Sequence, residues 1–469
     1  MSALASRFVC TGCGVAPHPL TTPPFRCPNA RRGDDVDHVL RRRLDVGSLG
    51  FPKTGDPNPF LRYRTLLHAY HLACAGGLPG EDFQALVRAL DERVAEIDGH
   101  GFAVTPYSRS DELSDALGLS RGGVWVKDET GNVAGSHKAR HLFGVLLYLE
   151  VAERLGILEG PADLAIASCG NAALAAGVIA AAGRRTLRVF VPVDADPLVL
   201  ARLEELGARI TTCPRDGKPG DPAYRRLLEA LDGGALPFTC QGNLNGLAIE
   251  GGQTLAWELV SSGAVVDRIV VQVGGGALAS ACIHAFREAV ALGALARSPR
   301  VDTVQTEGAW PLKRAFDAVG SGLPRSTREE RGRPDPIRFA SRHRSAFMWP
   351  WEEEPRSVAH GILDDETYDW LAVVEGMLAT GGRPLVVGEE TLEEANDLAR
   401  EATGIAVDHT GSAGLAGLLA LRAAGELAED ERVAVLFTGA VRTAPDERRH
   451  RDEKLPRARH PVAPGLRAR

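Results

Sequence analysis

The spacing of hydrophobic residues changes character along the chain at about Gly123. From there on, short apolar runs alternate with Ala- and Leu-rich segments in which apolar residues recur every three or four positions, and Gly or Pro stands between them. Short apolar runs are typical of buried strands, and the longer pattern is typical of helices. Strands that alternate with helices predict an α/β fold built on parallel-rich sheets.

The pattern assigns a residue range to each expected element. The predicted strands are 124–127, 164–167, 187–193, 268–273 and 433–437, and the predicted helices are 60–90, 138–155, 172–182, 197–206 and one that begins at Ala277. Pro197 and Gly207 mark the start and the end of one helix in the way that these residues usually do. The stretch 325–354 is rich in charge, Pro and Trp, and we expect an irregular excursion there.

Composition places the chain among globular proteins of ordinary charge. It has 469 residues, which suggests two or three domains, and 54 Lys and Arg against 61 Asp and Glu give a net charge of −7. The basic, proline-containing stretch 442–469 is predicted to be a solvated, disordered tail. Nothing indicates a nucleic-acid surface.

The sequence predicts a cytoplasmic location. No apolar run reaches the length of a membrane span, and the N-terminus lacks the pattern of a signal peptide. Most of the eight cysteines are scattered through apolar segments, as reduced core thiols are. We therefore expect a cytoplasmic protein with no membrane partner.

Four junctions between a strand and a helix carry residues suited to chemistry, and ligands of parallel sheets bind at such junctions. The first is Gly135-Ser136-His137-Lys138, where a lysine enters the first turn of a helix. The helix dipole disfavours a cation there and so favours the neutral, nucleophilic amine. A solvated surface lysine is the alternative.

The second junction is Ser168-Cys169-Gly170-Asn171, between a buried strand and a helix. Backbone N–H groups at such a place can bind an anion such as a carboxylate. Asn171 could instead serve only as the cap of the helix.

The third junction is Gly274-Gly275-Gly276-Ala277, whose glycines permit close approach of the backbone to a phosphate. With Ala279 in the last place it also matches the dinucleotide pattern, but 297–300 offers arginines where that pattern expects an acid. The fourth junction is Thr438, at the end of the last strand. Its hydroxyl could bond a ring nitrogen, or it could belong to a plain turn.

Taken together, the four junctions resemble the tryptophan-synthase-β-like superfamily of pyridoxal-phosphate enzymes, or fold type II, which includes threonine synthases and serine/threonine ammonia-lyases. The resemblance covers about 105–443, with further matches at 105–107, 250–254 and 411–414. Two departures concern the substrate. His137 and Ala139 replace the Phe and Asp of Ser-Phe-Lys-Asp-Arg, and a histidine before the lysine is more similar to the tryptophan synthase β chain. Nothing in 168–171 corresponds to the glutamate of that chain.

The resemblance implies a fold of two α/β domains with the cofactor, pyridoxal 5′-phosphate, in the cleft between them. The larger, cofactor-binding domain takes 41–145 and 246–445, and a smaller, mobile domain takes 146–245. The remaining ranges are an N-terminal segment, 1–40, and the tail, 446–469. Members of this kind also lead us to expect a homodimer.

The resemblance also implies a role for each candidate residue. Lys138 carries the cofactor and then removes the Cα proton of an amino-acid substrate. Asn171 bonds the phenolic oxygen of the cofactor ring and Thr438 its pyridine nitrogen. The phosphate is held by Gly274, Gly275, Gly276 and Ala277, with His137 as an additional contact. Ser136, Ser168, Cys169 and Gly170 face the substrate.

The activity that we expect first is an ammonia-lyase-type α,β-elimination on threonine, serine or a related β-substituted amino acid. A threonine-synthase-like β,γ-replacement on O-phosphohomoserine is the second expectation. A nicotinamide-dependent enzyme and a cofactor-free binding protein are the remaining alternatives.

The N-terminal segment has a resemblance of its own. Cys10-Thr11-Gly12-Cys13-Gly14, followed by Phe25-Arg26-Cys27-Pro28, resembles the zinc-ribbon-like start of some threonine synthases. A structural zinc usually takes four ligands, and Ala30 stands where the fourth cysteine is expected. His18 or His38 could substitute for it, and a degenerate ribbon without metal is the alternative.

Overall fold

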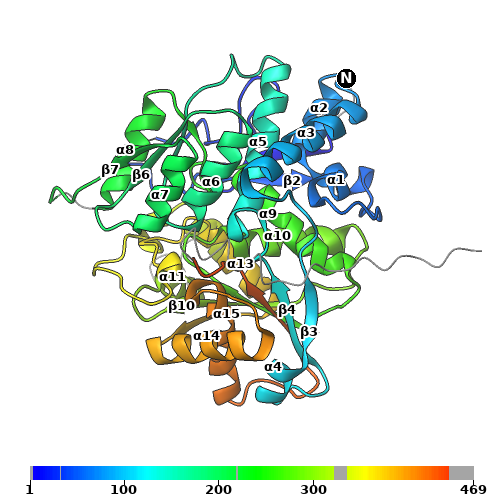
Figure 1. Ribbon diagram of the computed structural model, residues 1–469, viewed down its shortest axis with the longest axis vertical. Helices are drawn as coiled ribbons and strands as arrows, with labels where there is room; N and C mark the ends of the chain where they lie inside the picture. The colour runs from blue at the N-terminus through cyan, green and yellow to red at the C-terminus, as the bar shows by residue number, and fades with distance from the viewer. Residues whose placement is uncertain (1–3, 32, 218–219, 322–334, 443–469) are drawn as a thin grey trace, which may run out of the picture.

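The fold, seen in a computed structural model, is built on three separate β-sheets (Figure 1). The structure describes residues 4–31, 33–217, 220–321 and 335–442. A two-stranded antiparallel sheet joins β1 (Ser6–Cys10) to β2 (Leu40–Leu44). A six-stranded sheet and a four-stranded sheet form the bulk of the molecule, and this confirms the α/β class.

The larger sheet has the strand order β11-β10-β9-β12-β4-β3. Its strands are β3 (Tyr107–Ser110), β4 (Gly123–Asp128), β9 (Arg268–Gln272), β10 (Arg300–Thr306), β11 (Pro384–Val387) and β12 (Arg432–Phe437). All of them run parallel except the edge strand β3. Helices cover both faces, which is why the inner strands are buried along nearly their whole length.

The smaller sheet is entirely parallel and has the order β7-β6-β5-β8. Its strands are β5 (Leu164–Ala167), β6 (Leu187–Val191), β7 (Arg209–Thr212) and β8 (Leu236–Pro237). All four fall within 146–245, the range predicted for a smaller domain. The domain boundaries themselves stay a prediction.

The helices pack on both sheets, with α14 and α15 under the larger sheet in the view of Figure 1 and α5, α6, α9 and α10 between the two sheets. The longer helices are α3 (Gly80–Asp98), α5 (Lys138–Arg154), α6 (Asn171–Ala182), α8 (Pro222–Asp232), α9 (Ala248–Ser261), α10 (Ala277–Ala291), α11 (Pro311–Gly320), α13 (Trp370–Thr380), α14 (Glu389–Thr403) and α15 (His409–Ala423). The shorter ones are α1 (Pro59–Arg62), α2 (His68–Ala75), α4 (Asp111–Ala116), α7 (Pro197–Glu205) and α12 (Pro336–Ala340).

Most of the predicted elements are confirmed, but the long helix over 60–90 is wrong. That stretch divides into α1, a 3-10 turn (Arg64–Leu66), α2 and the first half of α3. Leu67 adopts extended backbone, and Gly77 has a positive φ of 87°, so neither permits a continuous helix. Pro79 then opens α3, where a proline is tolerated before the first turn.

Two other predictions also need correction. The described part of the expected excursion, 335–354, contains α12 and a 3-10 turn (Arg344–Ala346), and it packs onto the fold: Trp351 lies against Trp310. Arg442, which was assigned to the disordered tail, forms an ion pair with Asp196. The rest of the predicted tail lies outside the described residues, as does 325–334.

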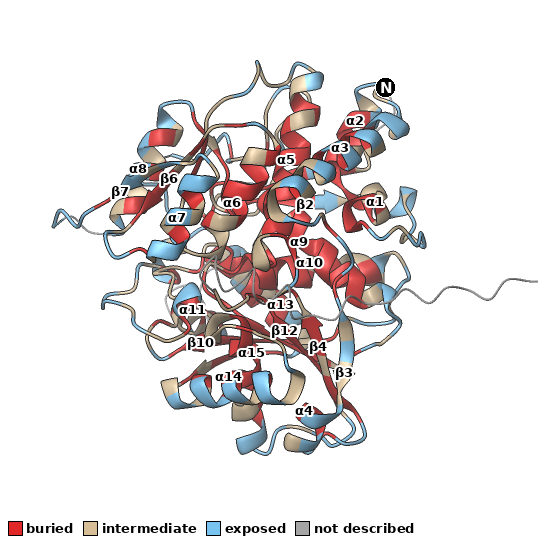
Figure 2. Ribbon diagram, in the orientation of Figure 1, coloured by how far each residue is buried: buried red, intermediate tan, exposed pale blue. Residues whose placement is uncertain are grey.

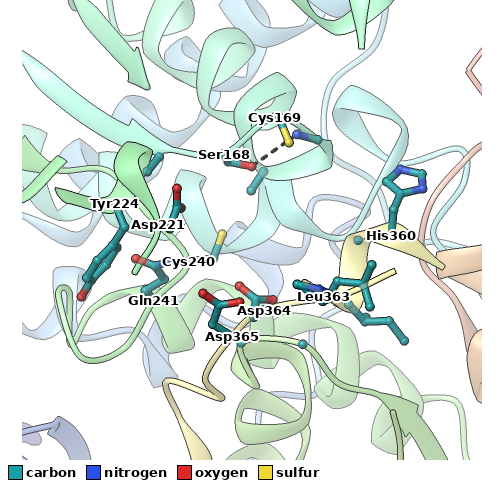
Figure 3. Close-up of a pocket in the computed structure, with 18 of the residues that line it drawn as sticks. Ser168, Cys169, Asp221, Tyr224, Cys240, Gln241, His360, Leu363, Asp364 and Asp365 are labelled. Carbon is teal, nitrogen blue, oxygen red and sulfur yellow. Dashed lines mark hydrogen bonds between the residues drawn. The ribbon is translucent and has the colours of Figure 1, made fainter. Parts of the chain in front are cut away.

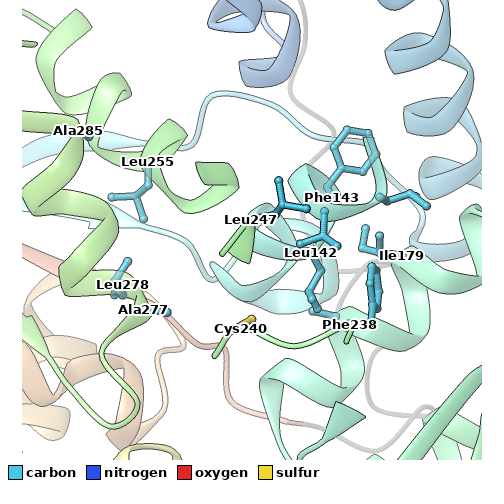
Figure 4. Packing of buried hydrophobic residues seen from close by; sticks show 14 of the residues in the cluster. Leu142, Phe143, Ile179, Phe238, Cys240, Leu247, Leu255, Ala277, Leu278 and Ala285 are labelled. Carbon is cyan, nitrogen blue, oxygen red and sulfur yellow. The ribbon is translucent and has the colours of Figure 1, made fainter. Parts of the chain in front are cut away.

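The core between the two sheets depends on close contact between α5 and α9 (Figure 2). Its side chains include Leu142 and Phe143 of α5, with Leu247, directly before α9, close by (Figure 4). A Cβ on Gly144 would lie 2.9 Å from the Cα of Gly251, and a Cβ on Gly251 would lie 2.0 Å from the carbonyl oxygen of Arg140. Glycine is therefore required in α9 so that α5, which begins at Lys138, can lie directly against it. No described helix is long and apolar enough to span a bilayer.

Candidate active site

The four predicted junctions converge on one cleft between the two sheets. The cleft has a volume of about 610 Å³, and residues at the carboxyl ends of β5, β6, β8, β9 and β12 line it. Each predicted site residue contributes to the lining except Ser136. Both sheets thus present their carboxyl ends to a common space, as parallel sheets do at their ligand sites.

Lys138 enters this cleft from the first residue of α5. Within the described part of the chain its ammonium has neither an ion-pair nor a hydrogen-bond partner. The loop before it contains Ala134 at a φ of 56°, a left-handed conformation that costs a non-glycine residue roughly 1–2 kcal/mol. Asp98 accepts the N–H of Ala134 at 2.8 Å and helps to fix this turn.

Behind Lys138 lies a fully buried ion network. Arg140 donates two hydrogen bonds to Glu129, at 2.7 and 2.9 Å, and two to Glu258, at 2.6 and 3.2 Å. Lys127 donates a hydrogen bond to Oε2 of Glu258. Burial alone would raise the pKa of Glu258, but Arg140 and Lys127 outweigh burial, so the net shift of this pKa is downward. The four charges balance, so the network fixes the base of the loop that carries Lys138.

The glycine junction follows β9 and opens α10. Gly276 has a φ of 91°, and Thr367 donates from Oγ1 to the carbonyl oxygen of Gly274 at 3.0 Å. A Cβ on Gly275 would lie 2.9 Å from the ring of Tyr368, because the segment 361–369 lies directly on the loop. The loop therefore has no room for side chains.

A carboxylate already lies at this loop. The backbone N–H of Gly275 donates to Asp364, while burial outweighs this bond and raises the pKa of Asp364 to about 6. Figure 3 shows Asp364 and Asp365 facing Cys240 and Gln241 across the cleft. The loop N–H groups can thus bind an anion. The carboxylate of Asp364 occupies the position that a phosphate oxygen would take.

The hydroxyl of Thr438 is oriented by Gln272. The side-chain Nε2 of Gln272 donates to Thr438 Oγ1 at 2.7 Å and also to the carbonyl oxygens of Gly411 and Leu436. Because the two carbonyls accept only from an N–H group, the amide cannot be flipped. Thr438 therefore accepts from Gln272 and keeps its own proton free to donate into the cleft.

Asn171, in the junction after β5, contacts Arg442, which follows β12, and Asp408, which precedes α15. Its Oδ1 accepts from Arg442 at 3.1 Å, and its amide donates to Asp408, which lowers the pKa of that carboxyl against the larger effect of burial. Ser168 and Cys169 lie just before α6, with the hydroxyl of Ser168 turned back toward the N–H of Gly170 at 3.4 Å (Figure 3).

His137 and Ser136 lie differently from what their predicted roles require. The His137 ring lies 3.3 Å by Nδ1 from the carbonyl oxygen of Thr438, and burial holds its pKa well below the usual value, so the ring is neutral with the proton on Nδ1. Its Nε2 then offers a lone pair, which suits a proton donor better than a phosphate. Ser136 is fully buried and bridges Gly439 through its backbone.

Several residues of the cleft were not found from the sequence. They are Asp221, Tyr224, Cys240, Gln241, Asp364, Tyr368 and Arg442. Most of them come from irregular segments, where no periodic pattern marks them. The one available signal was the acidic run 364–366, which is unusual directly before an apolar helix.

This arrangement fits pyridoxal 5′-phosphate. The family described as "Pyridoxal-phosphate dependent enzyme" matches residues 100–439, which is most of the chain and spans all four junctions. The loop at Gly274–Gly276 holds an anion, Thr438 offers a donor for a ring nitrogen, and Lys138 offers an amine without a partner among the described residues. Where the cofactor binds, these three features would meet its phosphate, its pyridine nitrogen and its aldehyde.

Three named proteins are similar to this chain. The chain is 27% identical over 342 residues to a threonine synthase of Methanosarcina acetivorans, covering 71% of this chain and 74% of the relative. Among solved structures it is similar to the processed form of threonine deaminase isoform 2 from Solanum lycopersicum, with 17% identity, a TM-score of 0.53 and coverage of 80% and 93%. It is also similar to a diaminopropionate ammonia lyase of Escherichia coli, with 15% identity, a TM-score of 0.57 and coverage of 82% and 94%.

The predicted fold type and cofactor are thereby confirmed, and the matched family accounts for the glycine junction that had also suggested a dinucleotide. The site residues stay predictions that the geometry of the cleft supports. On the extent of the family match and the fit of the cleft, this chain belongs to the family of pyridoxal-phosphate-dependent enzymes.

Proposed function

We propose that this chain catalyses an α,β-elimination, of the ammonia-lyase type, on a hydroxy or otherwise β-substituted amino acid that carries no phosphate. Pyridoxal phosphate, when bound, supplies the electron sink that stabilises negative charge developing at Cα. The protein then has to bind and orient the substrate, to hold the ring nitrogen in a defined protonation state and to move protons.

The orientation of the Thr438 hydroxyl is the observation that carries this proposal. Since Gln272 donates to Oγ1, the hydroxyl proton of Thr438 is left to donate to a ring nitrogen, and a nitrogen that accepts this hydrogen bond is unprotonated. An unprotonated ring is a moderate electron sink. It suits loss of a β-substituent better than transamination, which requires stronger stabilisation of charge.

Lys138 is the proposed base. Its amine has no partner among the described residues, and a neutral imidazole, His137, stands next to it in the chain. Lys138 would take the Cα proton and return it to the departing hydroxyl, so that water leaves with its full complement of protons. The lone pair on Nε2 of His137 can accept a hydrogen bond from the ammonium that forms.

The start of α6 is the proposed carboxylate site. Backbone N–H groups at 169–171 lie at a helix N-terminus, where the dipole favours an anion. Arg442 holds the side chain of Asn171 from outside this turn. A carboxylate bound there would direct the substrate Cα toward the other wall of the cleft.

The charge of the cleft argues against a phosphorylated substrate. Its acidic lining residues are Asp221, Glu352, Glu353, Glu354, Asp364, Asp365 and Asp408. Among the lining arginines, Arg442 is paired with Asp196 and Arg215 is exposed. A second dianion would need unpaired Arg or Lys side chains at short distance, as phosphate sites usually provide.

A threonine-synthase-like β,γ-replacement on O-phosphohomoserine is the second candidate, favoured by relatives of that name at 24–27% identity. The experiment that separates the two uses purified holoenzyme with L-threonine, L-serine, L-2,3-diaminopropionate and O-phosphohomoserine. Release of ammonia and a keto acid from one of the first three, without phosphate release from the fourth, supports elimination. Phosphate release with formation of threonine would contradict it.

A further inference from the structure

The N-terminal segment brings three cysteines and one histidine to a single point far along the chain from the cleft residues. Cys10 ends β1, Cys13 and Cys27 lie in the long connection that follows, and His38 lies just before β2. One ligand atom from each lies within 4.8 Å of the other three, and all three cysteines are free. We propose that this chain binds one zinc ion through Cys10, Cys13, Cys27 and His38.

The separations between these atoms are those of neighbouring ligands on one metal ion. Cys10 Sγ lies 3.4 Å from His38 Nδ1, and Cys13 Sγ lies 3.6 Å from Cys27 Sγ. Tetrahedral zinc with Zn–S of about 2.3 Å and Zn–N of about 2.0 Å requires ligand atoms roughly 3.5–3.8 Å apart. A disulfide would instead bring two sulfurs to about 2.05 Å.

His38 is held in the orientation that a ligand needs. Its Nε2 lies 2.8 Å from Oδ2 of Asp34, so the ring carries its proton on Nε2 and directs the lone pair of Nδ1 at the three sulfurs. A carboxylate behind a ligating imidazole is the common second partner in zinc sites, where it fixes the tautomer and strengthens the ligand.

The backbone around the cysteines is also shaped for a metal. The N–H of Cys13 points at Cys10 Sγ at 3.5 Å, and the amide of Asn29 points at Cys13 Sγ at 3.6 Å. Such N–H groups stabilise thiolates. The turn between Cys10 and Cys13 is tight, because a Cβ on Gly12 would lie 2.4 Å from Val36.

The zinc ion would have a structural and not a catalytic role. Four protein ligands leave no open position for a substrate, and thiolates with one imidazole select zinc over hard cations. The described residues between β1 and β2 contain neither helix nor strand, so this connection has little else to fix its shape. Binding would release the three thiol protons as Zn²⁺ replaces them.

The loop that carries His38 also contacts the segment lying over the glycine junction. Asp37 accepts from the indole N–H of Trp370 at 3.2 Å, and its own N–H donates to the carbonyl oxygen of Ser341 at 2.8 Å. Trp370 begins α13 directly after 361–369, the segment that packs on Gly274–Gly276. A zinc ion would therefore help to fix Asp37, which holds Trp370 at the end of the segment 361–369 that lines the cleft.

The first test is the metal content of the full-length protein, purified without chelator. We expect about one zinc per chain by elemental analysis, independent of pyridoxal-phosphate loading. Replacement of zinc with Co²⁺ should give the visible bands of a tetrahedral thiolate site. Absence of zinc together with no binding of added Zn²⁺ or Co²⁺ at micromolar concentration would overturn the proposal, as would iron in its place.

Variants distinguish His38 from a neighbouring histidine. His38→Ala should lose the zinc or bind it at least tenfold more weakly. His18→Ala is the matched control, because His18 is an exposed residue of the same segment and lies outside the cluster, and it should keep the full metal content. Loss of zinc in the His18 variant alone would overturn the ligand assignment. The Co²⁺ spectrum of the wild-type protein decides the matter if the His38 variant fails to fold.

Discussion

Buried charges are paired on one side of Lys138 and have no ion-pair partner among the described residues on the other. Behind it, Arg140 and Lys127 are each paired with Glu129 or Glu258 at hydrogen-bond distance, and all four are buried. In front of it, the carboxylates of Asp364 and Asp369 accept from backbone N–H groups and form no ion pair among the described residues. Burial raises the pKa of Asp369 to about 7 and that of Asp364 to about 6.

This difference separates structure from function in the site. A balanced buried network has its lowest free energy in one arrangement, so it defines where the lysine loop lies. Enclosed carboxyls without a cation instead carry an unfavourable free energy that a ligand, a proton or a cation can relieve. The back of the site is therefore complete in the chain alone, whereas the front is suited to respond to what binds.

The largest effect is expected from breaking the balance behind Lys138. Arg140→Ala would leave Glu129 and Glu258 buried with one cation between them, which costs about 3–5 kcal/mol in the free energy of unfolding. Urea denaturation of the apoenzyme would measure it. The variant should also lose cofactor binding, since Lys138 lies in the same turn of α5 as Arg140.

The matched control for this prediction is Arg297→Ala. Arg297 also pairs with an acid, Asp267, but it is largely exposed, so water replaces the lost contact and the stability should change little. Equal losses in the two variants would show that the buried network has no special role.

The sequence predicts the parts of the site that are local in the chain and misses those that only the fold brings together. The four junctions were predictable because each is a local pattern of strand, small or hydroxyl residue, and helix. The network was not, since Arg140 and Glu258 lie 118 positions apart and meet only when α5 packs on α9. Asp364 and Tyr368 stand in a segment without periodicity, and only the fold brings them to Gly275.

The next prediction concerns the ring nitrogen. Thr438→Asp keeps an acceptor for Gln272 but places a carboxylate where a hydroxyl donated, so a bound ring should become protonated. Elimination should slow by about 10- to 100-fold, the value of one hydrogen bond to a charged group, and transamination should rise. Keto-acid release compared with conversion of the cofactor to its amine form measures both.

Thr438→Val is the matched control for the ring nitrogen. It removes the donor without adding a charge, so it should slow elimination and leave the partition toward transamination as it is in the wild type. If Thr438→Asp partitions like Thr438→Val when both are fully loaded, the residue does not contact the ring.

A smaller effect should come from Asp364 itself. A phosphate at Gly275 favours the neutral form of this carboxyl, whose pKa is already about 6, so the affinity for pyridoxal phosphate should fall as the pH rises from 5.5 to 8. Asp364→Asn should bind the cofactor about tenfold more tightly at pH 8, which corresponds to about one pKa unit, and nearly as the wild type does at pH 5.5. Fluorescence titration of the apoenzyme would measure this.

Asp365→Asn provides the comparison for the Asp364 variant. Asp365 also lines the cleft and lies next in the chain, but the bond from the Gly275 N–H goes to Asp364. Its variant should shift the affinity less and retain the pH dependence. The same shift in both variants would mean that the general charge of the cleft matters and the contact with the loop does not.

The last prediction is a pH-dependent change in stability at Asp369. Among the described residues its side chain accepts only the N–H of Gly242, at 3.2 Å, and burial raises its pKa to about 7, well above the value of an unfolded chain. The folded apoenzyme therefore binds this proton more tightly than the unfolded chain does, so stability is present at low pH and falls as the pH rises from about 4 through 7. Asp369→Asn keeps an acceptor for Gly242 and removes the ionisation. It should raise the stability at pH 8 by up to about 4 kcal/mol, because the pKa lies about three units above that of the unfolded chain and each unit is worth about 1.4 kcal/mol, and leave it unchanged near pH 4. Calorimetry at the two pH values measures the difference, and a gain that is equal at both would show that folding does not raise the pKa of this carboxyl.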